Sequence, residues 1–267
     1  MLLSPPMHIV AIAELATPIE VEAAALAVDL GTTAYEERLN LLTGLPSVVL
    51  TTVDRAVAQA LVAKVRARKH RALLVDSDNV IPHEAMTSMR GFSLDAKGVT
   101  VGEQELPYGE ITVLLRAMHR TSSETQSETK SRQFSAGKAL LTGGLAFTKT
   151  VTKEEKTAAQ TSEQVLYLFR GDGETPWLLR ERGTSYAGLG PALTVSSAQN
   201  FLATIAHLRK HASEAAYDER LLNPRGATSR LTRSGTATAS TTSVSSASGV
   251  DLLAHLLAKT LSRRQAI

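Results

Sequence analysis

The chain has 267 residues, 43% of them hydrophobic and 4% aromatic, so it is long enough for two domains with aliphatic cores. It contains no cysteine, which excludes disulfides, thiolate catalysis and cysteine-ligated zinc. The formal net charge is +3, but six basic residues and one acidic residue lie from Arg225 onward, so the preceding part is slightly acidic and no nucleic-acid partner is expected.

The first predicted elements are a strand and a well-marked helix. The run HIVAIAEL, residues 8–15, is apolar and of strand length. In the sequence that follows, Thr17 is placed to cap a helix, Pro18 suits its first turn and Glu20 completes a capping box. Gly31 is expected to end this helix.

A second capping box, formed by Thr33 and Glu36, predicts a second helix. A β-branched strand, an amphipathic helix and another strand follow at residues 47–53, 55–70 and 72–78. This order predicts a split β-α-β module over residues 1–80, with helices packed on one face of a small sheet.

The order of elements over residues 8 to 78, including the run TAYEERLNLL, resembles the C-terminal domain of the ribosomal stalk protein. The lysine-rich helical face of that domain is not matched, because acidic residues occupy the first two helices: Glu20, Glu22, Glu36 and Glu37. The resemblance implies a fold only, and ribosomal function is not carried over.

After Asn79 the pattern changes to alternation, which predicts short strands and a long one from Ile111 to Met118. The segment GDGETP predicts a hairpin between runs that end at Phe169 and begin at Trp177. A helix with a capping box at Ser196 follows. Its apolar stripe contains Phe201, Ile205 and Leu208.

Antiparallel strands closed by one C-terminal helix, with LPYGEITVLL at 106–115 leading into the long strand, resemble the bacterial pleckstrin-homology-like (PH-like) barrel. The resemblance covers residues 88 to 215 and implies an antiparallel PH-like β domain at 86–217. The expected fold class is therefore α+β. Such barrels serve as interaction platforms, so no particular ligand is implied.

The last part of the chain combines a polar linker with an apolar stripe. Residues 218–249 are rich in Ser, Thr and Ala, which predicts a disordered linker. Residues 250–265 predict an amphipathic helix that must dock on its own chain, on a partner or on a membrane surface. Its stripe contains Leu252, Leu253, Leu256, Leu257 and Leu261.

The stretch FSAGKALLTGGL, residues 134–145, contains a Gly-Lys pair of the kind that holds phosphate in nucleotide-binding loops. Arg132 stands where that motif needs Gly, and Ala139 stands where it needs Ser or Thr. Nucleotide binding is therefore not expected here. The segment is interpreted as a strand pair with a long excursion or as an exposed patch, with Leu141, that meets the C-terminal helix or a partner.

Two groups of residues have spacings that suit a metal ion. His207 and His211 lie four apart on a predicted helix, and Asp76 and Asp78 follow a strand. Arg209 and Lys210 beside the histidines, and the turn-forming DSDN sequence, favour a solvated helix face and a turn instead. A metal-dependent enzyme that uses these residues is kept as an alternative function.

The only tryptophan, Trp177, lies near Arg180 and Arg182 and is a candidate partner anchor, although lone tryptophans are usually core residues. No catalytic or cofactor motif is found, so no cofactor is expected. The sequence favours a non-catalytic interaction or adaptor protein with a protein partner. A cytoplasmic location is expected because the N-terminal stretch lacks a basic region and no apolar run is long enough for a membrane span. Peripheral membrane binding through the last helix is a second alternative.

Overall fold

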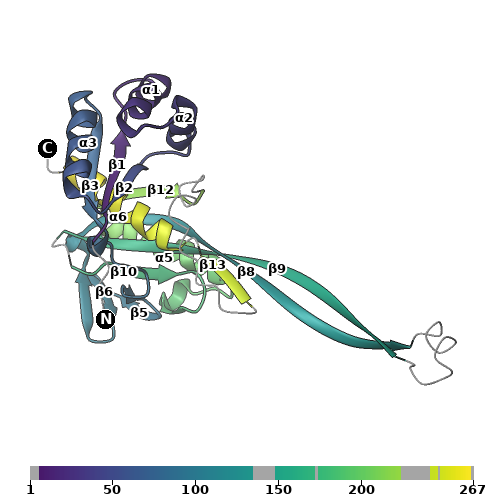
Figure 1. Ribbon diagram of the computed structural model, residues 1–267. Helices are drawn as coiled ribbons and strands as arrows, with labels where there is room; N and C mark the ends of the chain where they lie inside the picture. The colour runs from purple at the N-terminus through teal and green to yellow at the C-terminus, as the bar shows by residue number, and fades with distance from the viewer. Residues whose placement is uncertain (1–5, 135–147, 172–173, 224–240, 246, 266–267) are drawn as a thin grey trace. The chain divides into compact units, whose positions relative to one another are not determined.

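The computed structural model describes residues 6–134, 148–171, 174–223, 241–245 and 247–265. The chain divides into two compact units (Figure 1). The first contains residues 1–119, 162–233 and 246–267, and the second contains residues 120–161 and 234–245.

The N-terminal module has the predicted order of elements. They are β1 (His8–Glu14), α1 (Ile19–Leu30), α2 (Ala34–Leu42), β2 (Ser47–Thr52), α3 (Arg55–Ala67) and β3 (Arg71–Asp76). Gly31 ends α1 in the left-handed conformation, with φ of 67°, and Thr33 with Glu36 forms the expected capping box of α2. The expected cap at Thr17 is wrong, because α1 begins at Ile19 and Pro18 takes the N-cap position without a side-chain bond.

Both faces of the small sheet are covered. Its strands are antiparallel in the order β2-β1-β3. Side chains alternate along β1, so Val10 and Ile12 pack with the three helices while Ile9 and Ala11 enter a second core on the opposite face. The expected layer of helices therefore covers one face of the sheet, and a second core covers the other face.

The rest of the first unit contains two further sheets. One has six strands: five follow the path β12-β8-β9-β10-β4, and the sixth, β13 (Thr241–Ser245), pairs with β8. The other has four strands in the order β11-β5-β6-β7. Their bounds are β4 (Thr87–Ser88), β5 (Gly91–Leu94), β6 (Gly98–Val101), β7 (Gln104–Pro107), β8 (Ile111–Phe134), β9 (Thr148–Arg170), β10 (Trp177–Arg180), β11 (Ser185–Gly188) and β12 (Ala216–Leu221). The predicted hairpin is confirmed as the antiparallel pair β9–β10.

The expectation of a closed PH-like barrel is not met, since no sheet built from the described residues closes on itself. The short edge strand β4 joins β10 in parallel, and β12 joins β8 in parallel at the other edge. The four-stranded sheet and helix α5 (Ser197–His211) pack on one face of the six-stranded sheet. Mixed α+β content is what the structure supports.

Strands β8 and β9 are longer than predicted and continue into the second unit. There β13 (Thr241–Ser245) pairs with β8, from Thr241 opposite Thr125 to Ser245 opposite Thr121. The segment expected to be a linker, 218–249, therefore includes the end of β12, all of β13 and the first residues of α6, and its residues 224–240 and 246 lie outside the described ones.

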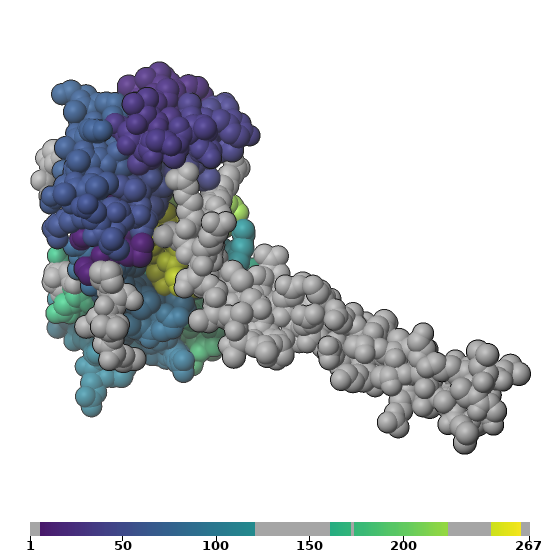
Figure 2. Space-filling model, in the orientation of Figure 1, coloured from purple at the N-terminus to yellow at the C-terminus, as the bar shows by residue number. Residues whose placement is uncertain are grey.

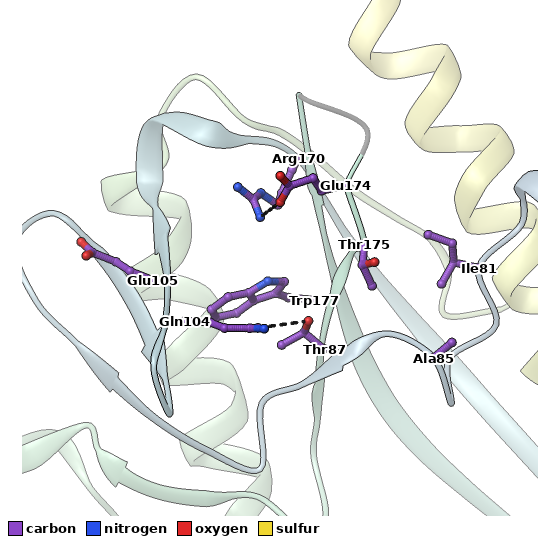
Figure 3. Close-up of a pocket in the computed structure, with 9 residues that line it drawn as sticks. All are labelled: Ile81, Ala85, Thr87, Gln104, Glu105, Arg170, Glu174, Thr175 and Trp177. Carbon is purple, nitrogen blue, oxygen red and sulfur yellow. Dashed lines mark hydrogen bonds and ion pairs between the residues drawn. The ribbon is translucent and has the colours of Figure 1, made fainter.

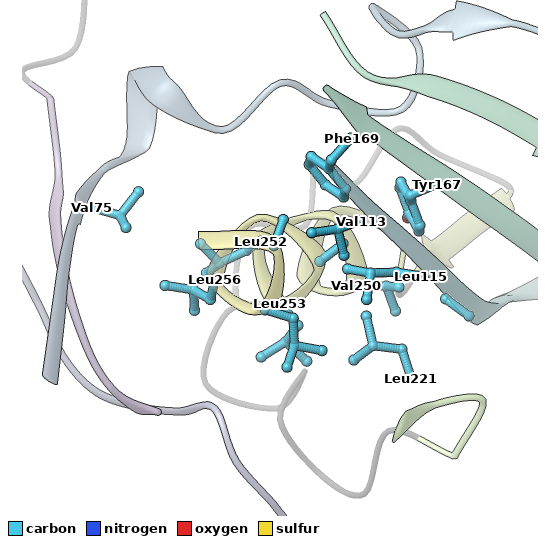
Figure 4. Packing of buried hydrophobic residues seen from close by; sticks show 14 of the residues in the cluster. Val75, Val113, Leu115, Tyr167, Phe169, Leu221, Val250, Leu252, Leu253 and Leu256 are labelled. Carbon is cyan, nitrogen blue, oxygen red and sulfur yellow. The ribbon is translucent and has the colours of Figure 1, made fainter. Parts of the chain in front are cut away.

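The last helix, α6 (Ala247–Gln265), lies inside the first unit between two sheets. Figure 4 shows its leucines between Val75 of β3 and Val113, Leu115 and Phe169 of the six-stranded sheet. In Figure 2 part of α6, in yellow, is visible below the N-terminal module. No helix in the described part of the chain is both long enough and apolar enough to cross a membrane.

The leucine stripe of α6 therefore belongs to the core of the first unit. Its members are at most 3% exposed, except Leu261, which is partly buried and packs against the same cluster. The helix docks on its own chain, the first of the three expected alternatives. In this structure the stripe is not available to a membrane or to a partner. Its members are Leu252, Leu253, Leu256, Leu257 and Leu261.

Candidate functional site

Two parallel strand pairings bring arginines together from distant parts of the chain. Thr87 and Ser88 of β4 run beside Trp177 and Leu178 of β10. A few residues later Ser185 of β11 pairs with Gly91 of β5, and its N–H donates to the carbonyl oxygen of Arg90 at 2.6 Å. The segments around 87–91 and 177–185 therefore lie side by side.

The result is a pocket of about 510 Å³, which we call the arginine pocket. Its lining includes His83, Ser88, Arg90, Arg180, Arg182 and Thr184. Gly183 helps to form the turn after β10, with φ of 71°, a conformation that side chains other than glycine rarely adopt.

The arginine pocket carries an excess of positive charge. Arg180 contacts Glu163 at 3.4 Å, and the same carboxylate accepts the backbone N–H of Arg182. No ion pair joins the guanidinium of Arg90 or of Arg182 to a carboxylate among residues 6–120, 161–171, 174–223 and 247–262. Among the lining residues that the structure describes, the one acidic side chain is that of Glu84, which is 69% exposed.

His83 connects this pocket to a buried polar network. Its backbone N–H and its Nδ1 both lie at hydrogen-bond distance from Oδ2 of Asp251, at 3.0 and 2.9 Å. Asp251 is on α6 and is 1% exposed. The Tyr167 hydroxyl donates to its Oδ1 at 2.7 Å, and His119 Nε2 lies 2.6 Å from the Tyr167 oxygen.

The network fixes where its protons are. Because the Tyr167 hydroxyl donates to Asp251, the phenolic oxygen must accept from His119 Nε2–H. Burial lowers the pKa of His119 to about 4, so the ring is neutral near pH 7. Burial alone would raise the pKa of Asp251, but hydrogen bonds from His83 and Tyr167 lower it below its usual value, and the carboxylate is ionised.

The alternative of a metal site at Asp76 and Asp78, or at His207 and His211, is not supported by the geometry. Asp76 accepts from His8 Nδ1 at 2.6 Å and has Arg55 beside it, while Asp78 contacts Ser77 on the surface. The rings of His207 and His211 stack at 4.0 Å. His207 Nε2 bonds the Tyr108 hydroxyl, and His211 Nδ1 bonds the backbone of His207.

Among the described residues, the geometry instead gathers His83, Glu84 and Asp251, whose ligand atoms lie within 4.8 Å of one another. Both oxygens of Asp251 already accept hydrogen bonds, so this group is a hydrogen-bond network and not an open cage for a cation. Sequence reasoning missed it because its members are separated by as many as 168 residues.

Trp177 is 2% exposed and belongs to the core between the two larger sheets, which corrects its role as a partner anchor. It also lines a second pocket of about 640 Å³, shown in Figure 3 with Gln104 and Thr87 beside the ring. Arg170 there is paired with Glu174. Of the predicted interaction residues, Arg180 and Arg182 reach the arginine pocket, while Leu141 lies outside the described residues.

Comparison of the chain with protein-family models, with curated proteins and with solved structures found no match. The resemblances of the N-terminal module to the ribosomal stalk domain and of the central part to PH-like domains therefore stay predictions.

Proposed function

We propose that the protein is a non-catalytic interaction or adaptor protein that binds an anionic group of its partner in the arginine pocket. The main support for this proposal is that Arg90, Arg180 and Arg182 line one cavity. Of these, Arg90 and Arg182 make no ion pair with the described carboxylates. A guanidinium is always charged and presents donors in a planar fork that matches carboxylate and phosphate oxygens.

The lining supports recognition more than catalysis. The Thr184 hydroxyl donates to the carbonyl oxygen of Arg180, which holds the turn that carries Arg182. Ser88 adds a hydroxyl to the lining from the edge strand β4. The arginines thus lie at the ends of paired strands, where the sheet holds their backbone in place. A cytoplasmic setting, which the sequence predicted, is part of this proposal.

The test is isothermal titration of the full chain with inorganic pyrophosphate at low and at high salt. We expect binding that weakens with salt. Arg90→Ala and Arg182→Ala should each weaken it by about tenfold, since a charge-assisted hydrogen bond is lost. Arg38→Ala is the matched control, because Arg38 is exposed on α2 and its partner is Glu20, in the N-terminal module.

The proposal fails if pyrophosphate does not bind, or if the pocket variants bind as well as Arg38→Ala does. Release of inorganic phosphate by the wild-type chain, with none from Arg182→Ala, would contradict the non-catalytic part of the proposal.

A further inference from the structure

Asp251 holds His83 in one orientation at the wall of the arginine pocket. Two donors of the same residue, the backbone N–H and Nδ1, meet one carboxylate oxygen. A ring held in this way donates Nδ1–H to Asp251, so Nε2 is the nitrogen that is left for other contacts. Nε2 lies 3.1 Å from Glu84, on the exposed side of the ring.

Asp251 itself does not reach the ligand space. It is 1% exposed, and Tyr167 occupies its other oxygen. It therefore acts only through His83. Glu84, by contrast, is 69% exposed, and its long side chain can leave Nε2 when a stronger partner arrives.

We propose that the arginine pocket takes a phosphate monoester, and that Asp251 is a positioning residue that aims His83 Nε2 at one phosphate oxygen. This inference rests on the proposed anion-binding function and names its ligand class. The support for it is the number of guanidinium groups and the segments that supply them. Arg90 comes from the β4–β5 segment, Arg180 from β10 and Arg182 from the turn after β10.

Three guanidinium donors from two separate segments of the chain suit a tetrahedral group better than a planar one. A carboxylate has two oxygens in one plane and is satisfied by a single bidentate arginine. A phosphate monoester offers three terminal oxygens that point in different directions. The cavity, of about 510 Å³, also has room for part of the group that carries the phosphate.

His83 adds a preference that arginines alone do not give. The second ionisation of a phosphate monoester has a pKa of about 6, so near neutral pH one proton is readily shared between the phosphate and an imidazole nitrogen. A carboxylate, with a pKa of about 4, and a sulfate ester do not offer that proton at neutral pH. The Nε2 contact therefore selects phosphate over both.

The experiment titrates the full chain with three matched probes: phenyl phosphate, phenyl sulfate and benzoate. We expect phenyl phosphate to bind about tenfold more tightly than either of the others. Equal binding of all three would overturn the phosphate inference and leave the anion-binding proposal standing. Absence of binding by all three would overturn both.

The positioning role is tested with Asp251→Asn, which keeps the size of the side chain and loses the charge. We expect about tenfold weaker binding of phenyl phosphate and loss of the Nδ1–H tautomer in the nitrogen chemical shifts of His83. Tyr167→Phe is the matched control, because it changes the same network and leaves the His83–Asp251 contact in place. Unchanged binding and an unchanged tautomer in Asp251→Asn would overturn the role.

If Asp251→Asn does not fold, His83→Ala decides, since it removes Nε2 without altering the buried helix. We expect the preference for phenyl phosphate over phenyl sulfate to disappear while both still bind through the arginines. A preference that survives in His83→Ala would overturn the inference.

Discussion

The carboxylate of Asp251, inside the last helix, accepts two hydrogen bonds from His83, which lies 168 residues earlier in the chain. One bond comes from the backbone and fixes the loop between β3 and β4. The other comes from the ring and fixes its orientation. A single buried side chain thus joins the core around α6 to the wall of the arginine pocket.

The leucines of α6 should behave as core residues. Leu256 is fully buried, so Leu256→Ala should lower the free energy of unfolding by about 2 to 5 kcal/mol. Leu202, on α5, is 45% exposed, and Leu202→Ala should change the free energy of unfolding by less than about 0.5 kcal/mol. Urea unfolding of both variants measures the difference, and equal stabilities would contradict the docked position of α6.

A buried charged cluster should stabilise the N-terminal module. Glu22 is 1% exposed and accepts from Arg68 at 2.8 and 2.7 Å and lies 2.6 Å from His70 Nε2. After Glu22→Ala, Arg68 keeps its ion pair with Asp29 but loses both bonds to Glu22, and buried His70 loses its carboxylate partner, so the change should cost about 3 to 5 kcal/mol.

The matched control is Glu20→Ala on the same helix, because Glu20 is exposed and pairs with exposed Arg38 at 3.4 Å. Its loss should cost less than about 1 kcal/mol. The free energy of unfolding of each variant by urea titration checks the contrast, and a cost for Glu20→Ala as large as for Glu22→Ala would be the contrary result.

Stability should fall with pH below the usual pKa of histidine because of His119. Its pKa is about 4 in the folded protein, against the ordinary histidine value of 6.5 that applies to the unfolded chain. Between these values the unfolded chain takes up a proton that the folded chain refuses, so the loss occurs as pH falls from 6.5 to 4 and amounts to roughly 3 kcal/mol.

The check for this pH dependence is His119→Gln, whose amide can still donate to the Tyr167 oxygen but does not titrate. Urea unfolding of wild type and variant at several pH values between about 7.5 and 4 should show a shallower fall for the variant. Parallel curves would assign the pH dependence to other groups, such as His255, whose pKa burial also lowers.

Gly188 should tolerate no side chain. A Cβ there would lie 2.1 Å from the carbonyl oxygen of Phe92, so Gly188→Ala must push β11 away from β5. Overpacking of this kind costs about 1 to 3 kcal/mol. Gly91→Ala is the control, since nothing lies within 4 Å of its Cβ position. Thermal unfolding of the two variants compares them, and equal melting temperatures would be the contrary outcome.

The sequence predicts local structure well and non-local pairing poorly in this chain. The capping box at Thr33 and the hairpin between Phe169 and Trp177 depend on nearby residues, and both form. The arginine pocket depends on parallel pairing of β4 with β10, and β4 is only two residues long. No periodic pattern marks so short a strand, so Arg90 and His83 could not be placed beside Arg182 in advance.

The leucine stripe on α6 is a second case in which the sequence does not predict a non-local contact. Its leucines at helical spacing predict that one face is covered, but spacing does not say by what. In the structure both flanks of the helix are covered, by β1–β3 on one side and by β8–β9 on the other. Because both flanks are covered, Ala254 and Thr260 are buried as well as the leucines. The sequence pattern does not predict burial of Ala254 or Thr260.

The buried position of α6 also sets an order for assembly at the ribosome. The strands that surround this helix are synthesised first, yet the core that they share contains Val250 to Ala258. Until those residues leave the exit tunnel, α6 cannot cover the inner faces of the two sheets, and the apolar side chains there stay exposed. Completion of this core therefore comes after synthesis of the strands and closes contacts of long sequence separation.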